Sequence, residues 1–573
     1  MKTEIIRHSL SHILATAVQG LFPGTKFGIG PAIENGFYYD FDLPKSLAPE
    51  DLPKIEEKMR EIIKQNILFK KRKLLKSDFN RLFKDQPYKL ELIEELTEKD
   101  SPETSIYQVG DFVDLCQGPH VKNTKEIPEA FKLTKIAGAY WRGSERNPML
   151  TRIYGVAFKT KKELDEYLLK EVEAEKRDHR ILGQKLELFL FDEEVGAGLP
   201  IWQPKGAILR NIITDYLYKE LTNQGYQWIV SPHIGKLDLW KTSGHWDLYR
   251  ENMYSPIDIE GEKYLLKPMN CPFHIKIYQS KIRSYKELPL YFAELGTVYR
   301  YERSGVLHGL TRVRGFTQDD AHIVCASGQL AKEVEKLLKA GFKTLKAFGF
   351  KDYDIYLSTR PEKYAGTEKG WQRATNSLKY VLENLKLKYQ IDPGGGVFYG
   401  PKIDIKIKDS LGRPWQCTTI QIDFNLPARF KMTYIDEKGK KQEPLMIHRA
   451  LLGSIERFIG VLLEHYGGAL PLWLAPEQIW IIPVGSRHEK YAKEVGERFK
   501  ILDLRFKIKD ENETVSKKIR EGEIQKIPYL LVVGDREMKL RAVRIRKRRK
   551  GDIGMVKLNK FVERVKIEIE KKK

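Results

Sequence analysis

The sequence predicts an α+β protein built from several domains. Its 573 residues are too many for a single hydrophobic core. Strand-like runs dominate residues 185–472, and a proline-rich segment at 470–476 separates them from the rest of the chain. Apolar runs then alternate with helical patterns in residues 473–573, which indicates a small, mostly parallel sheet.

The pattern divides the chain into four parts: a mixed α/β domain at 1–158, a connecting helix at 159–184, the largest domain at 185–472 and an α/β domain at 473–573. Within the connecting part, Leu164, Leu168 and Val172 recur every fourth residue among dense charges. This spacing is typical of an amphipathic helix, here expected from Lys161 to Gln184.

The composition favours a polyanionic partner in a reducing compartment. Lys and Arg number 100 against 78 Asp and Glu, a formal net charge of +22, which favours nucleic acid because basic side chains displace counterions from phosphates. The four cysteines form no CxxC pair, as expected without a disulfide framework. Arg7 and two histidines interrupt the first apolar helix, so a signal peptide is not expected. No run reaches the roughly 18 apolar residues of a membrane span. We therefore expect a cytoplasmic protein with no membrane partner.

Two expected strands display side chains that bind phosphates and bases. A strand at 298–304 points Arg300 and Glu302 to the same side. Arginine can form a fork onto phosphate, and a carboxylate can accept from an exocyclic amine such as that of adenine. A second strand would present a longer row on one face: Arg312, Arg314, Phe316, Gln318, Asp320 and His322. A merely solvated face seldom contains Phe and His, so we interpret this row as a binding site.

A third segment, 446–460, is expected to be a strand that leads into a helix at Gly453. The strand would present His448 and Ala450 on one side, and Arg457 would follow one turn after Gly453. Small residues at such a turn let a nucleotide approach closely, and the arginine can meet its outer phosphate. Alone, the segment is also consistent with a helix that has one snorkelling arginine.

Together, these segments resemble motifs two and three of the class II aminoacyl-tRNA synthetases. The helix at 208–224 and the strand at 227–232 resemble motif one, which forms the dimer interface in that family. The resemblance implies an antiparallel sheet flanked by helices and a homodimer through motif one. It also implies an enzyme that uses ATP and Mg²⁺ to join an amino acid to tRNA.

Three soft ligands, Cys271, His322 and His448, accompany these segments. One Cys and two His would leave a fourth zinc position open for substrate. With Met269, Gln318, Asp320, Tyr399 and Gln416, they resemble the threonyl-tRNA synthetase family over essentially the whole chain. The resemblance implies one Zn²⁺ per subunit, with L-threonine and tRNA(Thr) as substrates. Shape alone separates valine from threonine only by roughly a hundredfold, whereas zinc would reject valine for its missing hydroxyl.

The resemblance also implies roles for single residues. Arg300 would hold the α-phosphate, Glu302 the adenine amine and Phe316 the ring, while Arg312 and Arg457 would grip the terminal phosphate. The implied catalytic residues are Arg300, Glu302, Arg312 and Arg457. The implied ATP-binding residues are Arg300, Glu302, Arg312, Phe316, Gln416 and Arg457. The implied threonine-binding residues are Met269, Arg300, Gln318, Asp320, Tyr399, Gln421 and Ala450. The loop between Arg303 and Thr311 would reach the acceptor end of tRNA.

The first domain contains a second set of candidate residues. His8 and His12 lie one helical turn apart, and Cys116 and His120 have a similar spacing. The four could form a structural zinc site. With Lys89 and Asp114, however, they resemble the family's editing domain, where such residues position water against a mischarged seryl ester without metal. Because serine also carries a hydroxyl, a second sieve is needed, and we favour hydrolysis.

The last domain resembles the family's anticodon-binding domain. Eight of the twelve residues at 539–550 are basic, and they alternate with apolar residues as in a ribbon with one basic face. The resemblance implies base contacts by Glu537 and Arg544, although the segment from 537 to 554 is more basic than the family pattern.

Three alternatives stay open at this point. A prolyl or seryl synthetase would lack the Cys271, His322 and His448 set. A catalytically silent tRNA-binding relative, or a stand-alone deacylase, would not need the residues of motifs two and three. Family members also commonly begin with a further domain of roughly sixty residues, whereas this chain opens almost on His8. Either that domain is naturally absent or the sequence has been shortened.

Overall fold

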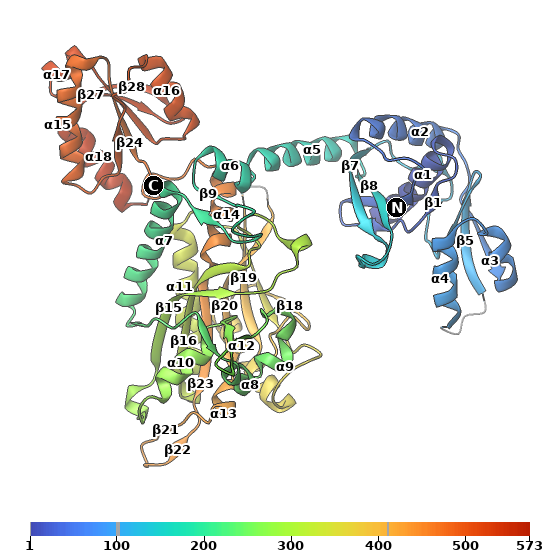
Figure 1. The fold of residues 1–573 in the computed structure, drawn as a ribbon, viewed down its shortest axis with the longest axis horizontal. Coiled ribbons are helices and arrows are strands. Elements are labelled where there is room, and N and C mark those ends of the chain that lie inside the picture. Colours follow the sequence, from blue (N-terminus) through green and yellow to red (C-terminus); the bar gives the residue numbers. More distant parts are fainter. Residues whose placement is uncertain (1, 99–102, 410–411, 573) are drawn as a thin grey trace. The chain divides into compact units, whose positions relative to one another are not determined.

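The computed structural model describes residues 2–98, 103–409 and 412–572 (Figure 1). It divides into two compact units, Met1–Glu173 and Ala174–Lys573. Among the described residues, no helix combines the length and apolarity needed to span a bilayer.

The first unit packs helices against two antiparallel sheets. The larger sheet has the order β1-β3-β8-β7, with β2 paired to β3. Its strands are β1 (Lys26–Phe27), β2 (Ala32–Ile33), β3 (Gly36–Asp42), β7 (Phe131–Tyr140) and β8 (Met149–Ala157), with helices α1 (Thr3–Leu21) and α2 (Leu52–Lys64). The second sheet contains β4 (Lys70–Leu75), β5 (Glu103–Val109) and β6 (Phe112–Leu115), next to α3 (Lys76–Leu82) and α4 (Pro87–Glu98). Leu10 and Leu14 of α1 share one apolar core with Phe37 and Phe41 of β3, so this core fixes the helix that carries His8 and His12.

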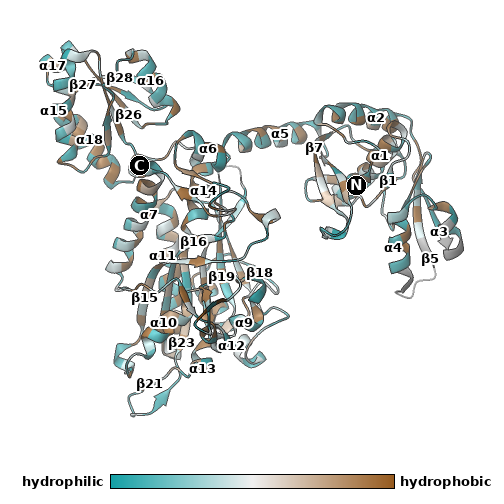
Figure 2. Cartoon of the chain, in the orientation of Figure 1, coloured by the Kyte–Doolittle hydropathy of each residue, from teal (hydrophilic) through white to brown (hydrophobic). Residues whose placement is uncertain are grey.

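The connecting segment is two helices rather than the single helix that we expected. Helix α5 (Lys161–Lys176) is largely hydrophilic in Figure 2. Helix α6 (His179–Lys185) starts anew because the Asp178 side chain accepts a hydrogen bond from the backbone N–H of Arg180 at 2.8 Å. Such an N-cap satisfies a donor at a helix start and so favours a break there.

The largest sheet has eight strands in the order β11-β15-β16-β23-β20-β19-β17-β18. Pairing is antiparallel except for β11 with β15 and β17 with β18. The strands are β11 (Gln227–Trp228), β15 (Leu290–Tyr299), β16 (Gly315–Cys325), β17 (Tyr353–Ser358), β18 (Gln390–Asp392), β19 (Lys402–Lys408), β20 (Pro414–Asp423) and β23 (Leu445–Ser454). The predicted antiparallel sheet is therefore confirmed.

Helices cover this sheet and complete its apolar core. The main ones are α7 (Pro204–Asn223), α11 (Leu330–Ala347), α12 (Glu368–Asn384) and α14 (Ile455–Tyr466). Helix α14 buries Ile455, Phe458, Ile459 and Leu462 completely, so one apolar face of this helix packs against the sheet. The shorter helices α8 (Leu237–Ser243), α9 (His245–Leu248), α10 (Cys271–Gln279) and α13 (Leu426–Arg429) belong to the same part of the chain, as does the sheet of β12 (Ile234–Lys236), β13 (Ile257–Ile259) and β14 (Glu262–Leu266).

The C-terminal sheet is mixed, so the expectation of a mostly parallel sheet was only half right. Strand β24 (Ile479–Pro483) runs parallel to β25 (Phe506–Ile508) and β26 (Tyr529–Val533). Strands β27 (Ala542–Lys547) and β28 (Gly551–Lys557) add antiparallel pairs, because the short turn between them cannot make a parallel crossover. The helices are α15 (Glu489–Lys500), α16 (Val515–Ile524), α17 (Asp535–Lys539) and α18 (Leu558–Glu570).

Several predicted boundaries in the motif segments were wrong. Strand β15 ends at Tyr299, so Arg300 and Glu302 follow it, and β16 begins only at Gly315, after Arg312. Strand β23 continues through Gly453, whose φ is +79°, so α14 starts two residues later than expected. In motif one, β11 has only two residues, because Ser231 gives its N–H to the side chain of Glu294 at 2.8 Å instead of to a neighbouring strand.

Candidate active sites

The register of two neighbouring strands brings the zinc candidates together. His322 of β16 lies directly opposite His448 of β23, and Cys271 is the first residue of α10. One ligand atom from each of the three lies within 4.8 Å of the others, and all three residues are buried. The structure therefore assembles a ligand set from positions separated by about 180 residues of sequence.

A carboxylate fixes the proton of His448. Its Nε2 lies 2.8 Å from Oδ2 of the buried Asp423. Because an ionised carboxylate only accepts, Nε2 carries a hydrogen, and in the neutral ring this leaves a lone pair on Nδ1. Asp423 thus orients the ring as the second shell of a metal site does.

A longer relay fixes the proton of His322. His274 Nε2 lies 3.1 Å from a carboxylate oxygen of Glu294, and His274 Nδ1 lies 2.8 Å from His322 Nδ1. Burial of Glu294 opposes its ionisation, yet hydrogen bonds from His274 and Ser231 hold its pKa at about 2. The carboxylate therefore accepts a hydrogen bond from His274 Nε2–H, and in the neutral His274 ring Nδ1 accepts from His322 Nδ1–H. Burial lowers the pKa of His322 well below its usual value, so this ring is neutral and its Nε2 bears a lone pair.

In the neutral forms of these rings, the two nitrogens that face each other are both acceptors. His322 Nε2 and His448 Nδ1 are then 2.9 Å apart with no hydrogen between them. Burial also raises the pKa of the nearby Cys271 thiol well above its usual value. Two lone pairs beside a sulfur fit a soft cation, which would bind both nitrogens and deprotonate the thiol. The residues present thus fit Zn²⁺.

A cavity of about 290 Å³ adjoins this cluster. All residues expected to bind threonine line it, together with Gln416 and the three zinc candidates: Met269, Cys271, Arg300, Gln318, Asp320, His322, Tyr399, Gln416, Gln421, His448 and Ala450. Inside, Asn270 donates to the Asp320 carboxylate at 3.0 Å, and the Tyr399 hydroxyl donates to Gln421 Oε1 at 2.6 Å. The cavity is of a size for a small polar molecule.

A second cavity, of about 310 Å³, lies beside the first. The remaining residues expected to bind ATP line it, along with part of β16 and its approach: Arg300, Glu302, Thr311, Arg312, Val313, Phe316, Gln318, Ser454 and Arg457. Arg300, Gln318 and Arg457 line both cavities. Two ligands bound in these cavities would therefore meet at Arg300.

The charges around the second cavity suit an anionic ligand. The guanidinium of Arg300 lies 5.1 Å from the ring centre of Phe316, and Arg312 Nε donates to Glu302 at 3.0 Å. Arg457 is inaccessible at its Nε, which has no hydrogen-bond partner among the described residues. Burial lowers the pKa of Arg457 below its usual value. A buried donor without a partner needs an explanation, and a phosphate would provide one.

Sequence reasoning overlooked several residues that support the site. Asp319 points away from the cavity and accepts from the backbone N–H groups of Leu451, Leu452 and Gly453 at 2.7–3.1 Å. Burial, partly offset by Arg449, raises its pKa to about 6. It holds the end of β23 beside the cavity. The signal in the sequence was Asp319 itself, an acidic residue among the small and apolar residues on the other face of the strand.

His274, Glu294 and Asp423, which orient the zinc candidates, were also missed. So was His245, whose Nε2 lies 3.9 Å from Cys271 Sγ and 2.9 Å from Met269 Sδ. Only His274 had a visible signal, because it lies three residues after Cys271, a spacing that places two side chains on one face of a helix.

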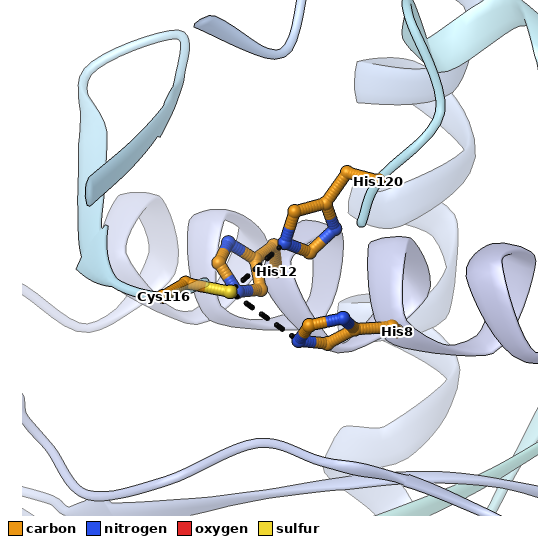
Figure 3. Close-up of side chains that lie close together, drawn as sticks. All are labelled: His8, His12, Cys116 and His120. Atoms are coloured by element: carbon orange, nitrogen blue, oxygen red, sulfur yellow. Dashed lines mark hydrogen bonds between the residues drawn. The ribbon is translucent and has the colours of Figure 1, made fainter. Parts of the chain in front are cut away.

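The first unit gathers His8, His12, Cys116 and His120 into one cluster of side chains (Figure 3). Cys116 Sγ lies 3.5 Å from His8 Nε2 and 3.2 Å from His120 Nε2, and the ring of His12 lies 4.2 Å from that of His120. Helix α1 supplies His8 and His12, while the chain after β6 supplies Cys116 and His120. Ligand atoms of all four lie within 4.8 Å of one another, so the metal alternative also has a geometric basis.

One charged pair, Lys89 and Asp114, lies beside this cluster. Lys89 forms an ion pair with Asp114, and both are buried. The other Asp114 oxygen accepts from the Tyr39 hydroxyl at 2.6 Å and lies 3.6 Å from His12 Nε2.

The imidazoles and the thiol of this cluster are uncharged. Burial lowers the pKa values of His8, His12 and His120, and burial raises the pKa of Cys116 to about 11. A neutral imidazole can accept a proton, but the same burial makes these imidazoles weaker bases than free histidine.

The two anticodon candidates differ in accessibility. Arg544 lies on the exposed face of β27 and pairs with Asp552 at 2.8 Å. The Glu537 side chain is buried and accepts from the Gly534 N–H at 3.1 Å. In this structure, Glu537 caps the start of α17.

Comparison with known proteins identifies each part of the chain. Residues 254–466 match the tRNA synthetase class II core domain (G, H, P, S and T), and 478–568 match the anticodon binding domain. Residues 104–154 match the threonyl and alanyl tRNA synthetase second additional domain. The threonine–tRNA ligase of Dehalococcoides mccartyi is 54% identical over 545 residues, which cover 95% of this chain and 93% of that relative.

The chain belongs to the threonyl-tRNA synthetase family. It is therefore an enzyme of class II. A second threonine–tRNA ligase, from Aquifex aeolicus, is 52% identical over 574 residues, 99% of this chain and 90% of the relative. A solved structure, titled the RNA binding domain of threonyl-tRNA synthetase from Cryptosporidium parvum, covers 68% of this chain and 98% of its own, with 40% identity and a TM-score of 0.66. The predicted family, fold class and enzyme class are confirmed. Prolyl and seryl synthetases, a silent relative and a stand-alone deacylase are no longer needed as explanations.

Proposed function

We propose that this family member activates L-threonine with ATP, transfers it to tRNA(Thr), and hydrolyses seryl-tRNA(Thr) in its first unit. The observation that carries the proposal is the shared wall of the two cavities. Because Arg300, Gln318 and Arg457 line both, an amino acid in one would lie next to a nucleotide in the other.

Cys271, His322 and His448 would hold one Zn²⁺ per subunit. When bound, the ion would supply a Lewis-acid position for the amino group and hydroxyl of threonine. Asp320 would accept a hydrogen bond from the amino group, which is neutral when it binds the ion, while Met269 and Ala450 would give apolar contact to the methyl group. Asp423 and the relay from Glu294 keep the two imidazoles oriented for ligation.

In the activation step, the threonine carboxylate attacks the α-phosphorus of ATP. A carboxylate–phosphorus bond forms as the bond to pyrophosphate breaks. Arg300 would neutralise charge on the α-phosphate, and Arg457 and Arg312 would hold the terminal phosphate with Mg²⁺. Phe316 would stack against the adenine. Glu302 would accept a hydrogen bond from the adenine amine once Arg312 has moved from Glu302 to the terminal phosphate. Gln416 would contact the nucleotide.

In the transfer step, the terminal ribose hydroxyl of tRNA(Thr) attacks the carbonyl carbon of the adenylate, and AMP leaves with the bonding electrons. The loop between Arg303 and Thr311 would hold the acceptor end. Arg544 and Glu537 would contact anticodon bases, the latter after releasing the Gly534 N–H.

In the first unit, a neutral imidazole from His8, His12 or His120 would take a proton from water that attacks the seryl ester. Asp114 and Lys89 would fix the polar side of this cluster. Because ligand atoms of His8, His12, Cys116 and His120 lie within 4.8 Å of one another, a metal-dependent hydrolysis is the alternative, and a chelator tests it. Hydrolysis that survives chelation would support the metal-free reaction.

The proposed domains are 1–158 for editing, 159–184 as a connector, 185–472 for catalysis and 473–573 for the anticodon. A homodimer through α7, β11 and the residues that follow β11 is supported by exposed apolar side chains: Ile208 and Tyr218 of α7 are 38% and 50% exposed, and Val230, two residues after β11, is 92% exposed. All four cysteines are free thiols, which supports a cytoplasmic location. Light scattering of the Val230→Asp variant tests the dimer, since the account predicts a monomer.

Threonine-dependent ATP–pyrophosphate exchange, followed by charging of tRNA(Thr), tests the proposed activity. We expect exchange with threonine, weaker exchange with serine and almost none with valine. Absence of exchange in a zinc-loaded protein would contradict the proposal.

A further inference from the structure

One histidine outside both sites touches the loop that follows Arg303. His179, the first residue of α6, is completely buried. The backbone N–H of Leu310 donates to its Nε2 at 2.9 Å. Leu310 closes the loop between Arg303 and Thr311 and is itself fully buried. This hydrogen bond therefore attaches the C-terminal end of the loop, at Leu310, to His179.

The other ring nitrogen is committed to a carboxylate. His179 Nδ1 lies 2.7 Å from Oε1 of Glu464, near the end of α14, and the backbone N–H of His179 donates to the same oxygen at 3.3 Å. Glu464 Oε2 pairs with Arg413. Since the carboxylate requires a donor, Nδ1 carries the hydrogen and Nε2 must be the acceptor that Leu310 needs. Asp178 lies within reach of this pair, but both ring nitrogens are already occupied, so the cluster serves as a hydrogen-bond anchor and not as a metal site.

The fit around the loop is tight. A side-chain carbon on Gly309, whose φ is +45°, would lie 2.2 Å from His179 Nε2. Directly after this turn, Arg312 exchanges backbone hydrogen bonds with His308 at 3.1 and 3.2 Å. Arg312 lines the second cavity. The position of one imidazole thus determines where the turn, and the arginine that follows it, can lie.

We propose that His179 is a positioning residue for this loop: through Glu464 and Leu310, it sets the turn from which Arg312 reaches the nucleotide and by which the loop meets the tRNA acceptor end. The inference rests on the proposed function for what Arg312 and the loop bind. It assigns no chemical step to His179, which does not line either cavity.

Two substitutions of His179 test its hydrogen bonds to Glu464 and to Leu310 separately. His179→Asn keeps a polar group near Nδ1 for Glu464 but cannot reach Leu310. His179→Gln can place a carboxamide oxygen near the position of Nε2. Loss of one hydrogen bond changes an equilibrium by up to roughly tenfold. We expect His179→Asn to raise the KM for ATP in pyrophosphate exchange, and the KM for tRNA in charging, by about fivefold to tenfold at nearly unchanged kcat for exchange. His179→Gln should restore most of the loss.

A purely structural defect would instead reduce the active fraction, lowering kcat at unchanged KM. Lys185→Ala, on the exposed side of the same helix, serves as the control and should match the parent. Should His179→Asn fold poorly, Gly309→Ala gives a second test, because it displaces the turn while leaving the imidazole intact. It should raise the same two KM values, and its effect should not add to that of His179→Asn.

The outcomes separate the two proposals. A parent enzyme without threonine-dependent exchange would overturn the proposed function. A normal parent whose His179→Asn and Gly309→Ala variants keep both KM values within twofold would overturn only the role of His179.

Discussion

His322 Nε2 and His448 Nδ1 face each other across two paired strands at 2.9 Å. In the neutral forms of these rings, each nitrogen points a lone pair at the other, because Asp423 accepts from His448 Nε2 and His274 accepts from His322 Nδ1. A cation shared with Cys271 would bind both lone pairs. Asp423 and Glu294 thus orient the two imidazoles that the proposed zinc site needs.

The relay behind His322 should control metal affinity. His274→Phe keeps a ring but removes the acceptor for His322 Nδ1–H, so His322 loses its fixed orientation. Zinc affinity, measured by competition with a chromogenic chelator, should fall by about 10–100-fold. Lys276→Gln, on the exposed side of α10, should leave it unchanged. Equal affinities for the two variants would contradict the relay.

The arginines between the cavities should affect chemistry more than folding. Arg300→Ala removes the charge nearest to the expected α-phosphate, and loss of such a group costs about 10²–10³ in kcat. Pyrophosphate exchange should fall by that factor while zinc content stays at the parent level. Arg360→Ala is the matched comparison, since its side chain pairs with Glu368 and lines neither cavity. A loss confined to KM for Arg300→Ala would argue against transition-state stabilisation.

Substitutions in the cluster of His8, His12, Cys116 and His120 should change only the hydrolysis of mischarged tRNA. His12→Ala removes a neutral base from the cluster, so seryl-tRNA(Thr) should accumulate and its deacylation should slow by about 10²–10⁴-fold. Charging with threonine should stay at the parent rate. The measurement is deacylation of preformed seryl-tRNA(Thr) with and without EDTA. A rate that collapses with EDTA in the parent would favour the metal alternative.

The stabilising contribution of ionised Glu294 should be lost in acid. Its pKa is about 2 in the folded protein against an ordinary 4.5, so the contribution is fully present above about pH 4.5 and is lost as pH falls towards 2. The shift corresponds to roughly 3 kcal/mol. Denaturant unfolding of the parent and Glu294→Gln should show a gap at pH 7 that narrows below pH 4.5. A gap independent of pH would exclude the linkage.

Local patterns predicted some features and could not predict others. Alternation along residues 311–323 placed Gln318, Asp320 and His322 on one face, because burial on the other face fixes the register of a strand. The resemblance predicted the sheet and the family. The break before His179 depends on a single capping group, the shortness of β11 on a side-chain hydrogen bond, and the mixed C-terminal sheet on the length of a turn. Asp423, Glu294 and Leu310 act through partners distant in sequence, which no local spacing shows.

The most direct test of the zinc assignment is metal analysis combined with threonine exchange on the same samples. Cys271→Ala removes the thiolate, whereas Cys325→Ala removes a buried cysteine from the apolar core away from the ligand set. The account predicts one zinc per chain and active exchange in the parent and in Cys325→Ala, with both lost in Cys271→Ala. Full threonine exchange by a zinc-free Cys271→Ala protein would contradict it.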